Sequence, residues 1–255
     1  MDDDELRRVV EAQGSTRWDR FLYWSGQFLN NDPGFEEGER NYKLPIVNRI
    51  VKARDLLLAG DASWVDQLSK AIHQKPNNLT NWRATQPLEA WCGEDSETAG
   101  LAFRSLWNPD VDVPDRMNEF VRVVSDAGRK APISEVAFFH MAMQPYDYPM
   151  YRSTAVERAM NLTGYVTPKE VGIPTGDVGR RYQHFLIFLD QVVKRGADQG
   201  ITFRDRLDAQ SAVWCVTQWS SPGHWSPTVN HVFLSYRGKA ELHKASWEQW
   251  RPSAD

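Results

Sequence analysis

The sequence predicts a mainly α-helical protein, a multi-helix bundle with a minor β element near its C-terminus. Apolar side chains recur at spacings of three and four residues through most of the chain, which is the pattern of amphipathic helices. Only residues 229–236 are rich in β-branched and aromatic side chains and partly alternate. With 41% hydrophobic and 25% charged residues, the 255-residue chain has the composition of a globular protein with a substantial core.

Five helices are expected in the first 113 residues. The first carries the apolar stripe Trp18, Phe21 and Leu22, and it stops at the turn residues 31–34. Asp61 and Ser63 can cap the third helix, because their side-chain oxygens accept from free amides at a helix start. The expected ranges are 18–29, 44–58, 61–72, 79–91 and 96–107.

The Pro- and Asp-rich segment 108–114 is the predicted boundary between two parts of the chain. An N-terminal helical lobe, residues 1–113, precedes a second helical domain, residues 114–255. A helix that is apolar on most sides is expected within the second domain and should be buried at its centre. The expected helices of this domain are 114–124, with Pro114 in its first turn, 132–143, which is the apolar one, 154–162, 175–196 and 203–219.

Charge is unevenly distributed along the chain. The formal net charge is −4, but residues 1–113 alone carry −6, while residues 114–206 carry +2. The overall acidity argues against a non-specific nucleic-acid binder, since such proteins are usually basic. An anion-binding face is therefore expected in the middle third if the protein has one.

The residue pattern predicts no metal site and no cofactor. None of the six histidines pairs with another histidine or a cysteine at a ligand spacing, and there is no phosphate-loop motif. Cys215 lies among apolar residues and is expected to be a small buried side chain, while Cys92 follows Trp91 at a predicted helix end. Neither has a basic neighbour in sequence, so neither is expected to be a nucleophile. The absence of a signal peptide and of a long apolar run leads us to expect a soluble, cytoplasmic protein.

The glycine-rich segment 172–179 has two interpretations. It can be a turn in which Thr175 or Asp177 caps the following helix. Alternatively, the amides at this helix start, together with Arg180 and Arg181, can bind a phosphate. A dinucleotide-binding fold is not indicated, because no apolar strand precedes the glycines.

Residues 128–156 contain the most informative motif. Gly128, Arg129 and Lys130 precede the apolar helix, a Pro-rich turn and a second short helix. This order resembles the core of the helix-hairpin-helix DNA glycosylase family, which implies a helix-hairpin-helix-like second half. The family's catalytic aspartate is missing, since Tyr151 and Arg152 follow Pro149 and Met150. A divergent glycosylase would have to use Lys130 with Asp147, on the other side of Pro149.

A second resemblance covers roughly residues 115–220. It rests on the run 139–153, on Gly164-Tyr165, and on Leu207-Asp-Ala-Gln-Ser-Ala-Val-Trp214. These motifs are similar to the N-terminal accessory modules of McrB-type AAA+ restriction proteins and their stand-alone relatives. The resemblance implies a recognition module that works beside an AAA+ motor or a nuclease subunit, and it implies no motor in this chain.

The candidate site residues come from the middle third and from one loop. In a nucleic-acid site, cations would hold phosphates and tyrosines would stack on an exposed base. The same residues can instead be solvated cations, core aromatics and, for Arg152, a partner of Glu157. Trp225 lies in a polar loop and is the candidate partner contact, while the helical tryptophans are expected to pack in the core. The nucleic-acid candidates are Arg129, Lys130, Tyr148, Tyr151, Arg152, Arg180 and Arg181.

Three functions follow from these patterns. The leading hypothesis is a non-catalytic recognition or adaptor protein of a prokaryotic defence or DNA-processing system, which contacts DNA through residues 114–206. The second hypothesis is a divergent helix-hairpin-helix DNA glycosylase. The third is a pure protein–protein interaction module, which fits the overall acidity.

Overall fold

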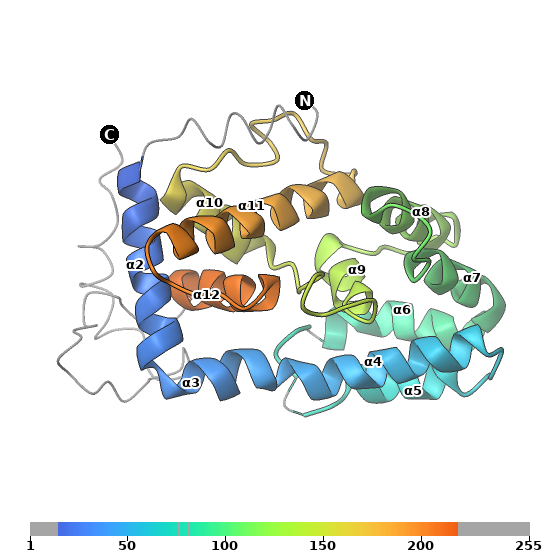
Figure 1. The fold of residues 1–255 in the computed structure, drawn as a ribbon. Helices are drawn as coiled ribbons and strands as arrows, with labels where there is room; N and C mark the ends of the chain where they lie inside the picture. The colour runs from blue at the N-terminus through green and yellow to red at the C-terminus, as the bar shows by residue number, and fades with distance from the viewer. Residues whose placement is uncertain (1–14, 76, 81, 219–255) are drawn as a thin grey trace. The chain divides into compact units, whose positions relative to one another are not determined.

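The structure, a computed structural model, describes residues 15–75, 77–80 and 82–218 (Figure 1). This part of the chain is mainly helical and contains no strand, which confirms the mainly α-helical part of the predicted fold class. The predicted β element at residues 229–236 and the candidate partner contact Trp225 lie outside the described residues. Within the described part, no helix combines the length and apolar character needed to cross a bilayer.

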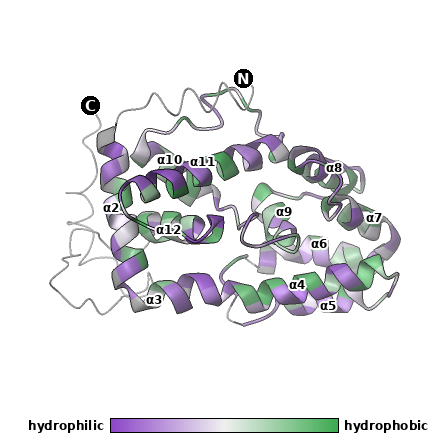
Figure 2. Cartoon of the chain, viewed as in Figure 1, coloured by the Kyte–Doolittle hydropathy of each residue, from purple (hydrophilic) through white to green (hydrophobic). Residues whose placement is uncertain are grey.

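The chain divides into two compact units, and each draws on separate stretches of sequence. Unit 1 comprises residues 1–40, 152–172 and 187–255, and unit 2 comprises residues 41–151 and 173–186. The long helix α11 (Val178–Asp198) has residues assigned to both units. In Figure 2 the helices alternate hydrophobic and hydrophilic residues along their ribbons, as the apolar spacing predicts.

Unit 1 is built around helices that pack on one another. Trp18 of α2 contacts the ring of Tyr165 at a centroid distance of 6.5 Å and that of Phe188 at 5.7 Å. Trp18 and Tyr165 are almost fully buried, so these aromatic contacts form the centre of the unit. The described helices that lie wholly or mostly in unit 1 are α2 (Ser15–Asn31), α3 (Pro33–Phe35), the π-helix η1 (Glu36–Asn41), α10 (Ser153–Thr163) and α12 (Arg206–Gln218).

The first helix ends at the turn residues 31–34 as predicted, since α2 stops at Asn31, and a new helical segment begins directly after it. Asp32 accepts a hydrogen bond from the amide of Gly34 at 2.6 Å, and Pro33 occupies the first turn of α3. The chain then passes through η1 before α4 begins at Lys43. The Asp-Pro pair therefore starts a new helical segment, because an Asp cap and a following proline favour a helix start.

Unit 2 is a helical assembly whose core is also aromatic. Phe103 of α7 contacts the rings of Trp64, Phe120 and Phe139 at 5.6, 5.1 and 5.2 Å. The indole of Trp107 donates to the backbone oxygen of Phe139 at 2.9 Å. The helices of this unit are α4 (Lys43–Leu58), α5 (Trp64–Ile72), α6 (Trp82–Glu94), α7 (Ser96–Leu106), α8 (Val113–Asp126) and α9 (Ile133–His140).

The predicted boundary at residue 113 does not coincide with the two compact units. Helices α7 and α8 lie on either side of segment 108–114, yet they pack against each other within unit 2. Phe103 and Phe120 carry this contact, so the Pro- and Asp-rich segment is a loop inside one core. Pro-rich composition marks a chain turn equally well inside a domain and between domains.

Two packing predictions are confirmed. Helix α9 is the apolar helix, and every one of its residues except Ser134 is buried. Its ends differ from the predicted range of 132–143, since it stops at His140 and continues as a turn. Of the tryptophans predicted to pack in the core, Trp214 is half-buried, and five are buried: Trp18, Trp24, Trp64, Trp91 and Trp107.

Candidate functional site

The predicted cations after α8 lie on a sharp turn. Gly128 adopts the left-handed conformation, with φ +72°, and ends helix α8. Its backbone amide donates to the backbone oxygen of Ser125, and the amide of Arg129 donates to the backbone oxygen of Val124. Arg129 forms an ion pair with Glu94 at 2.7 Å. Lys130 is exposed, and no described residue forms an ion pair with it. Of the two neighbouring cations Arg129 and Lys130, Lys130 is therefore the one that is available to bind a ligand.

At the start of α11, the structural interpretation is confirmed. Asp177 accepts from the amide of Arg180 at 3.1 Å, and Asn118 of α8 accepts from the amide of Gly179 at 2.9 Å. A Cβ at Gly179 would overlap the backbone of Pro114, so only glycine permits this approach. Because side-chain oxygens already accept from these two amides, the amides are not available as hydrogen-bond donors to a phosphate at this helix start.

The two predicted pairs of cations do not form one cluster. Gly179, next to Arg180, contacts Pro114 at the start of α8, whereas Arg129 follows its end. Helix α8 has 14 residues and is therefore about 21 Å long. Arg180 and Arg181 consequently lie near one end of α8, and Arg129 and Lys130 lie near the other.

The predicted aromatic residues are mainly structural. Tyr151 is fully buried and contacts Phe185 at 5.2 Å, so the prediction that it stacks on an exposed base is wrong for this conformation. Tyr148 is half-buried and contacts the rings of His140 at 4.8 Å and the guanidinium of Arg116 at 5.0 Å. Arg152 lies 5.7 Å from the ring of Trp214. The unit-2 tyrosines thus stabilise the core around α9 and the first turns of α11.

The pair proposed for a glycosylase is separated by α9. Lys130 precedes this helix and Asp147 follows it, and both are exposed. Eight helical residues span about 12 Å, so the fold does not place the two side chains next to each other through local structure. Cys215 is buried as predicted, and Cys92 is buried too, which raises the pKa of its thiol to about 12. Among the described residues, no three His, Cys, Asp or Glu side chains are placed to hold a metal ion.

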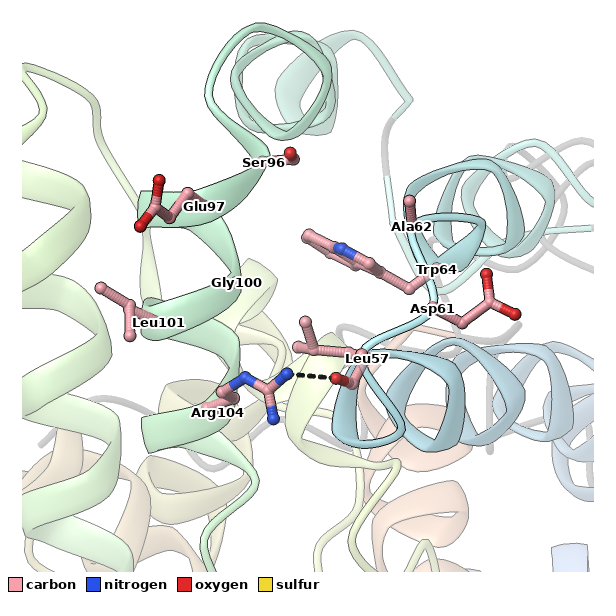
Figure 3. A pocket seen from close by; sticks show the side chains of 10 residues that line it. Leu57, Asp61, Ala62, Trp64, Ser96, Glu97, Gly100, Leu101 and Arg104 are labelled. Atoms are coloured by element: carbon pink, nitrogen blue, oxygen red, sulfur yellow. Dashed lines mark hydrogen bonds between the residues drawn. The ribbon is translucent and has the colours of Figure 1, made fainter.

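A pocket of about 280 Å³ in unit 2 is the site that the sequence did not reveal (Figure 3). Three helices contribute to it: the end of α4, the start of α5 and one face of α7. We call it the Trp64 pocket. It is lined by Leu57, Gly60, Asp61, Ala62, Trp64, Ser96, Glu97, Gly100, Leu101 and Arg104.

Local structure positions each wall of the Trp64 pocket. Gly60 follows the end of α4 with φ +77°, a left-handed conformation that turns the chain sharply. Its backbone amide donates to the backbone oxygen of Leu57, and the amide of Asp61 donates to the backbone oxygen of Leu56. Asp61 then accepts from the amide of Ser63 at 2.9 Å, and α5 begins at Trp64. Hydrogen bonding from Ser63 lowers the pKa of Asp61, so this carboxylate stays charged at neutral pH.

The facing wall is the first half of α7. Asp95 caps it by accepting from the amide of Thr98 at 3.1 Å. Gly100 lets α7 approach α4, because a Cβ there would lie 3.2 Å from Leu57 Cδ1. The guanidinium of Arg104 donates to the backbone oxygen of Leu57, as the dashed line in Figure 3 shows. This bond satisfies a carbonyl at the end of α4 and fixes the floor of the pocket.

The Trp64 pocket is apolar inside and acidic at its edge. Trp64 is only 3% exposed, and its ring packs on that of Phe103. Leu101 at the rim is 61% exposed. Figure 3 shows the carboxylates of Asp61 and Glu97 on opposite sides of the pocket. The buried ring and the exposed leucine suit a ligand with an apolar centre.

A second hollow of about 440 Å³ lies at the end of α5. One loop and the last turn of α5 supply its lining, and the lining includes His73, Gln74 and Asn77. The imidazole of His73 lies 2.9 Å from the carboxylate of Glu89, and the side-chain amide of Asn77 donates to the backbone oxygen of Ile72. These polar groups already stabilise the loop, so the Trp64 pocket is the stronger candidate.

In comparisons with known proteins, no family model, no curated protein and no solved structure matches this chain.

Proposed function

We propose that the chain is a non-catalytic recognition or adaptor protein that binds a partner protein at the Trp64 pocket. The observation that carries the proposal is the position of its exposed apolar side chains. Leu101 and Leu58 are 61% and 51% exposed, and they are the two most exposed large hydrophobic residues of the described chain. Leu101 lines the pocket, and Leu58 adjoins the lining residue Leu57.

An exposed leucine pair beside a pocket is costly unless something covers it. Large apolar side chains lose free energy when they stay in water, and contiguous apolar surface marks interaction sites on many proteins. The buried Trp64 and the close approach of α7 to α4 give the pocket a rigid floor. Binding anchors of this kind are apolar side chains that fill a preformed pocket.

The resemblance to McrB-type accessory modules supports a particular partner. We propose an AAA+ motor or a nuclease subunit encoded beside this chain, in a prokaryotic defence or DNA-processing system. The test is co-expression of the neighbouring gene product with tagged wild-type chain and with Leu101→Asp, followed by measurement of the binding constant of the purified pair.

We expect Leu101→Asp to weaken this complex at least tenfold, because it places a charge where an apolar anchor should sit. Tyr23→Ala is the matched control, since Tyr23 is 45% exposed and belongs to unit 1. Equal affinity for the wild type and Leu101→Asp would refute the proposed site.

A second candidate function is contact with nucleic acid near Gly128. Helices α8 and α9, joined by the left-handed Gly128 and an extended segment, support the helix-hairpin-helix-like arrangement that we propose for this region. The exposed Lys130 is the observation that favours it. Amides and cations on such a hairpin contact the phosphate backbone without reading sequence.

Binding of labelled duplex and single-stranded DNA at low salt tests this second function. Lys130→Glu should reduce affinity and lower the slope of log K against log salt by about 1 to 2. Lys52→Glu, at an exposed lysine on α4, serves as the control. No binding at about 20 mM salt, where the electrostatic attraction is strongest, would rule this function out.

A further inference from the structure

Arg116 of α8 is a cation that the fold of unit 2 buries, with only 3% of its surface exposed. We infer that unit 2 contains a binding site for one small oxyanion, a phosphate or a carboxylate, which the guanidinium of Arg116 holds beside the ring of Tyr148. Neither residue lines the Trp64 pocket, so the two sites can be tested independently.

The hydrogen bonds of the guanidinium are the first argument. Its Nη1 donates to the backbone oxygen of Asn108 at 3.2 Å. Its Nε and Nη2 are buried and make no hydrogen bond within the described part of the chain. These two nitrogens direct their N–H groups to the same side of the planar guanidinium, which is a side that binds two oxygens of one carboxylate or phosphate. The unsatisfied donors of Arg116 therefore have the arrangement that an oxyanion matches.

The lack of a counter-charge is the second argument. The buried Arg40 of unit 1 forms ion pairs with two aspartates, whereas no carboxylate of the described residues forms an ion pair with Arg116. Of the acidic residues near it in sequence, Asp112 and Asp115 are exposed, and Glu119 binds another arginine. A buried charge without a partner is costly, because it has lost its hydration and gained nothing in exchange. An anion from solution would remove this cost.

The position of Arg116 within α8 increases the need for an anion. Helix α8 begins at Val113, so Arg116 is its fourth residue and lies near the N-terminal end. This end of a helix carries a partial positive charge, which repels a cation and attracts an anion. The helix end and the guanidinium therefore favour the same kind of ligand.

The surroundings of Tyr148 are the third argument. The centre of its ring lies 5.0 Å from the guanidinium of Arg116 and 4.8 Å from the centre of the His140 imidazole. Both ring nitrogens of His140 are buried and have no hydrogen-bond partner in the described structure. Two polar groups that contact one aromatic ring are thus incompletely hydrogen-bonded, which is unusual in a protein core and indicates a site for a polar ligand.

Tyr148 also provides a path to the guanidinium. Its side chain is half-buried, and it belongs to segment 141–152, which contains no helix. Rotation of this side chain would expose Arg116 without breaking the hydrogen bonds of α8 or α9. Because the guanidinium itself is buried, the site suits a ligand of a few atoms and not a large molecule.

Calorimetric titration of the full-length protein with sodium phosphate, and separately with sodium acetate, tests the site. Sodium chloride keeps the ionic strength constant at about 150 mM, so that general screening does not change. We expect one site with a Kd of about 1 mM for the preferred anion, because two charge-assisted hydrogen bonds provide an affinity of this order. The anion that binds more tightly identifies the ligand as a phosphate or a carboxylate. At about 20 mM of that anion, Tm should rise by at least about 3 °C.

Three variants locate the bound anion. Arg116→Lys keeps the positive charge but lacks the two parallel donors, so it should weaken binding at least about tenfold. Arg116→Met removes the charge and should abolish both the binding heat and the rise in Tm. The matched control is Arg122→Met, because Arg122 lies on the same helix with a side chain that is 60% exposed. This control should bind the anion as the wild type does.

The outcomes decide whether Arg116 holds an anion. Binding that is lost in Arg116→Met and kept in Arg122→Met supports the site. Absence of binding for both anions overturns it. An equal rise in Tm for the wild type and Arg116→Met also overturns it, since phosphate stabilises many proteins through exclusion from their surface. If Arg116→Met does not fold, Arg116→Lys decides: a tenfold loss of affinity supports the site, and unchanged affinity overturns it.

Discussion

Two sets of buried ionisable side chains, one in each compact unit, differ in whether they carry charge. In unit 1, Arg40 and Asp208 are buried, and each is fully engaged: Arg40 donates to Asp205 at 2.7 and 2.9 Å and to Asp208 at 2.6 Å. Asp208 also accepts from Arg204 at 2.7 and 2.9 Å. Burial by itself raises the pKa of Asp205, but the hydrogen bond from Arg40, the backbone hydrogen bonds from Asp208 and Leu207 and the charge of Arg40 together hold the pKa below its ordinary value.

Unit 2 buries ionisable groups without such partners. Glu135 is 3% exposed, and burial raises its pKa to about 7. His140 is fully buried with no hydrogen bond to either ring nitrogen in the described structure. Burial, reinforced by the nearby charge of Arg116, holds the pKa of His140 well below its ordinary value. The Arg40, Asp205 and Asp208 cluster of unit 1 therefore stays charged and paired, whereas Glu135 and His140 of unit 2 favour their neutral forms.

The difference teaches that the two regions respond to different perturbations. Removing one member of a paired cluster leaves an uncompensated buried charge, which is a large cost at any pH near neutrality. Neutral buried groups instead make stability depend on pH, because the unfolded chain exchanges protons at its ordinary pKa values. Each prediction below tests one side of this comparison.

The largest expected effect is that of Asp208→Asn in unit 1. The substitution keeps the shape but removes the charge that Arg40 and Arg204 share. We expect the free energy of unfolding in urea at pH 7 to fall by about 3 kcal/mol. A loss below about 1 kcal/mol would mean that the cluster stabilises the fold no more than an exposed ion pair does.

Glu135→Gln should have the next largest effect. The folded pKa of about 7 exceeds the ordinary 4.5, so the stability that this group supplies is complete below pH 4.5 and is lost as the pH rises to about 7. The variant should therefore be more stable than the wild type at pH 8, by about 2 kcal/mol. A variant that is less stable at pH 8 would show that Glu135 is ionised and paired.

His140→Phe tests the opposite slope. Because the folded pKa is depressed, the stability from neutral His140 is present above pH 6.5 and is lost as the pH falls below it. Between pH 6.5 and 5.5 this group should cost about 1 kcal/mol, and the drop should be absent from the phenylalanine variant. Denaturant titrations at several pH values measure the slope independently of any packing change. An unchanged slope would contradict a neutral His140.

In the wild type the two slopes oppose each other. From pH 4.5 to 6.5, Glu135 stabilises the fold as the pH falls, while His140 destabilises it. The wild-type profile should therefore be flatter in this range than that of either variant.

The smallest effect is expected for Arg122→Ala. Arg122 forms ion pairs with Glu119 at 2.7 Å and Asp126 at 2.6 Å, but its side chain is 60% exposed. Water and salt screen such pairs, so Tm should change by less than about 2 °C. A larger change would mean that these exposed ion pairs also contribute substantially to stability, as the Asp208 cluster is expected to do.

The sequence predicted most helices because their apolar spacing is a local property. The cap at Asp177 and the burial of α9 were predicted for the same reason. Helix α6 was displaced, since it begins at Trp82 and continues through Pro87, a residue that usually ends a helix. The π-helix Glu36–Asn41 was missed because six polar residues carry no apolar period.

The sites could not be predicted in the same way. Arg40 and Asp208 are 168 residues apart, and only the fold brings them together. The Trp64 pocket depends on the close approach of Gly100 to Leu57, which leaves no periodic signal. Residues that were singled out for their chemical type, such as Tyr151, turned out to be core residues. Local pattern predicts local structure, whereas a site is a property of distant segments.

The contact at Gly179 has an evolutionary consequence. Its backbone lies so close to Pro114 that no other residue fits, and Asn118 supplies the side chain that receives its amide. A homologue that has diverged nearly everywhere else should still keep a glycine here, together with an amide or hydroxyl side chain four residues after the helix-starting proline. Asn118 and Gly179 lie 61 positions apart in the sequence. The two residues together can therefore be used to recognise distant homologues in a sequence search.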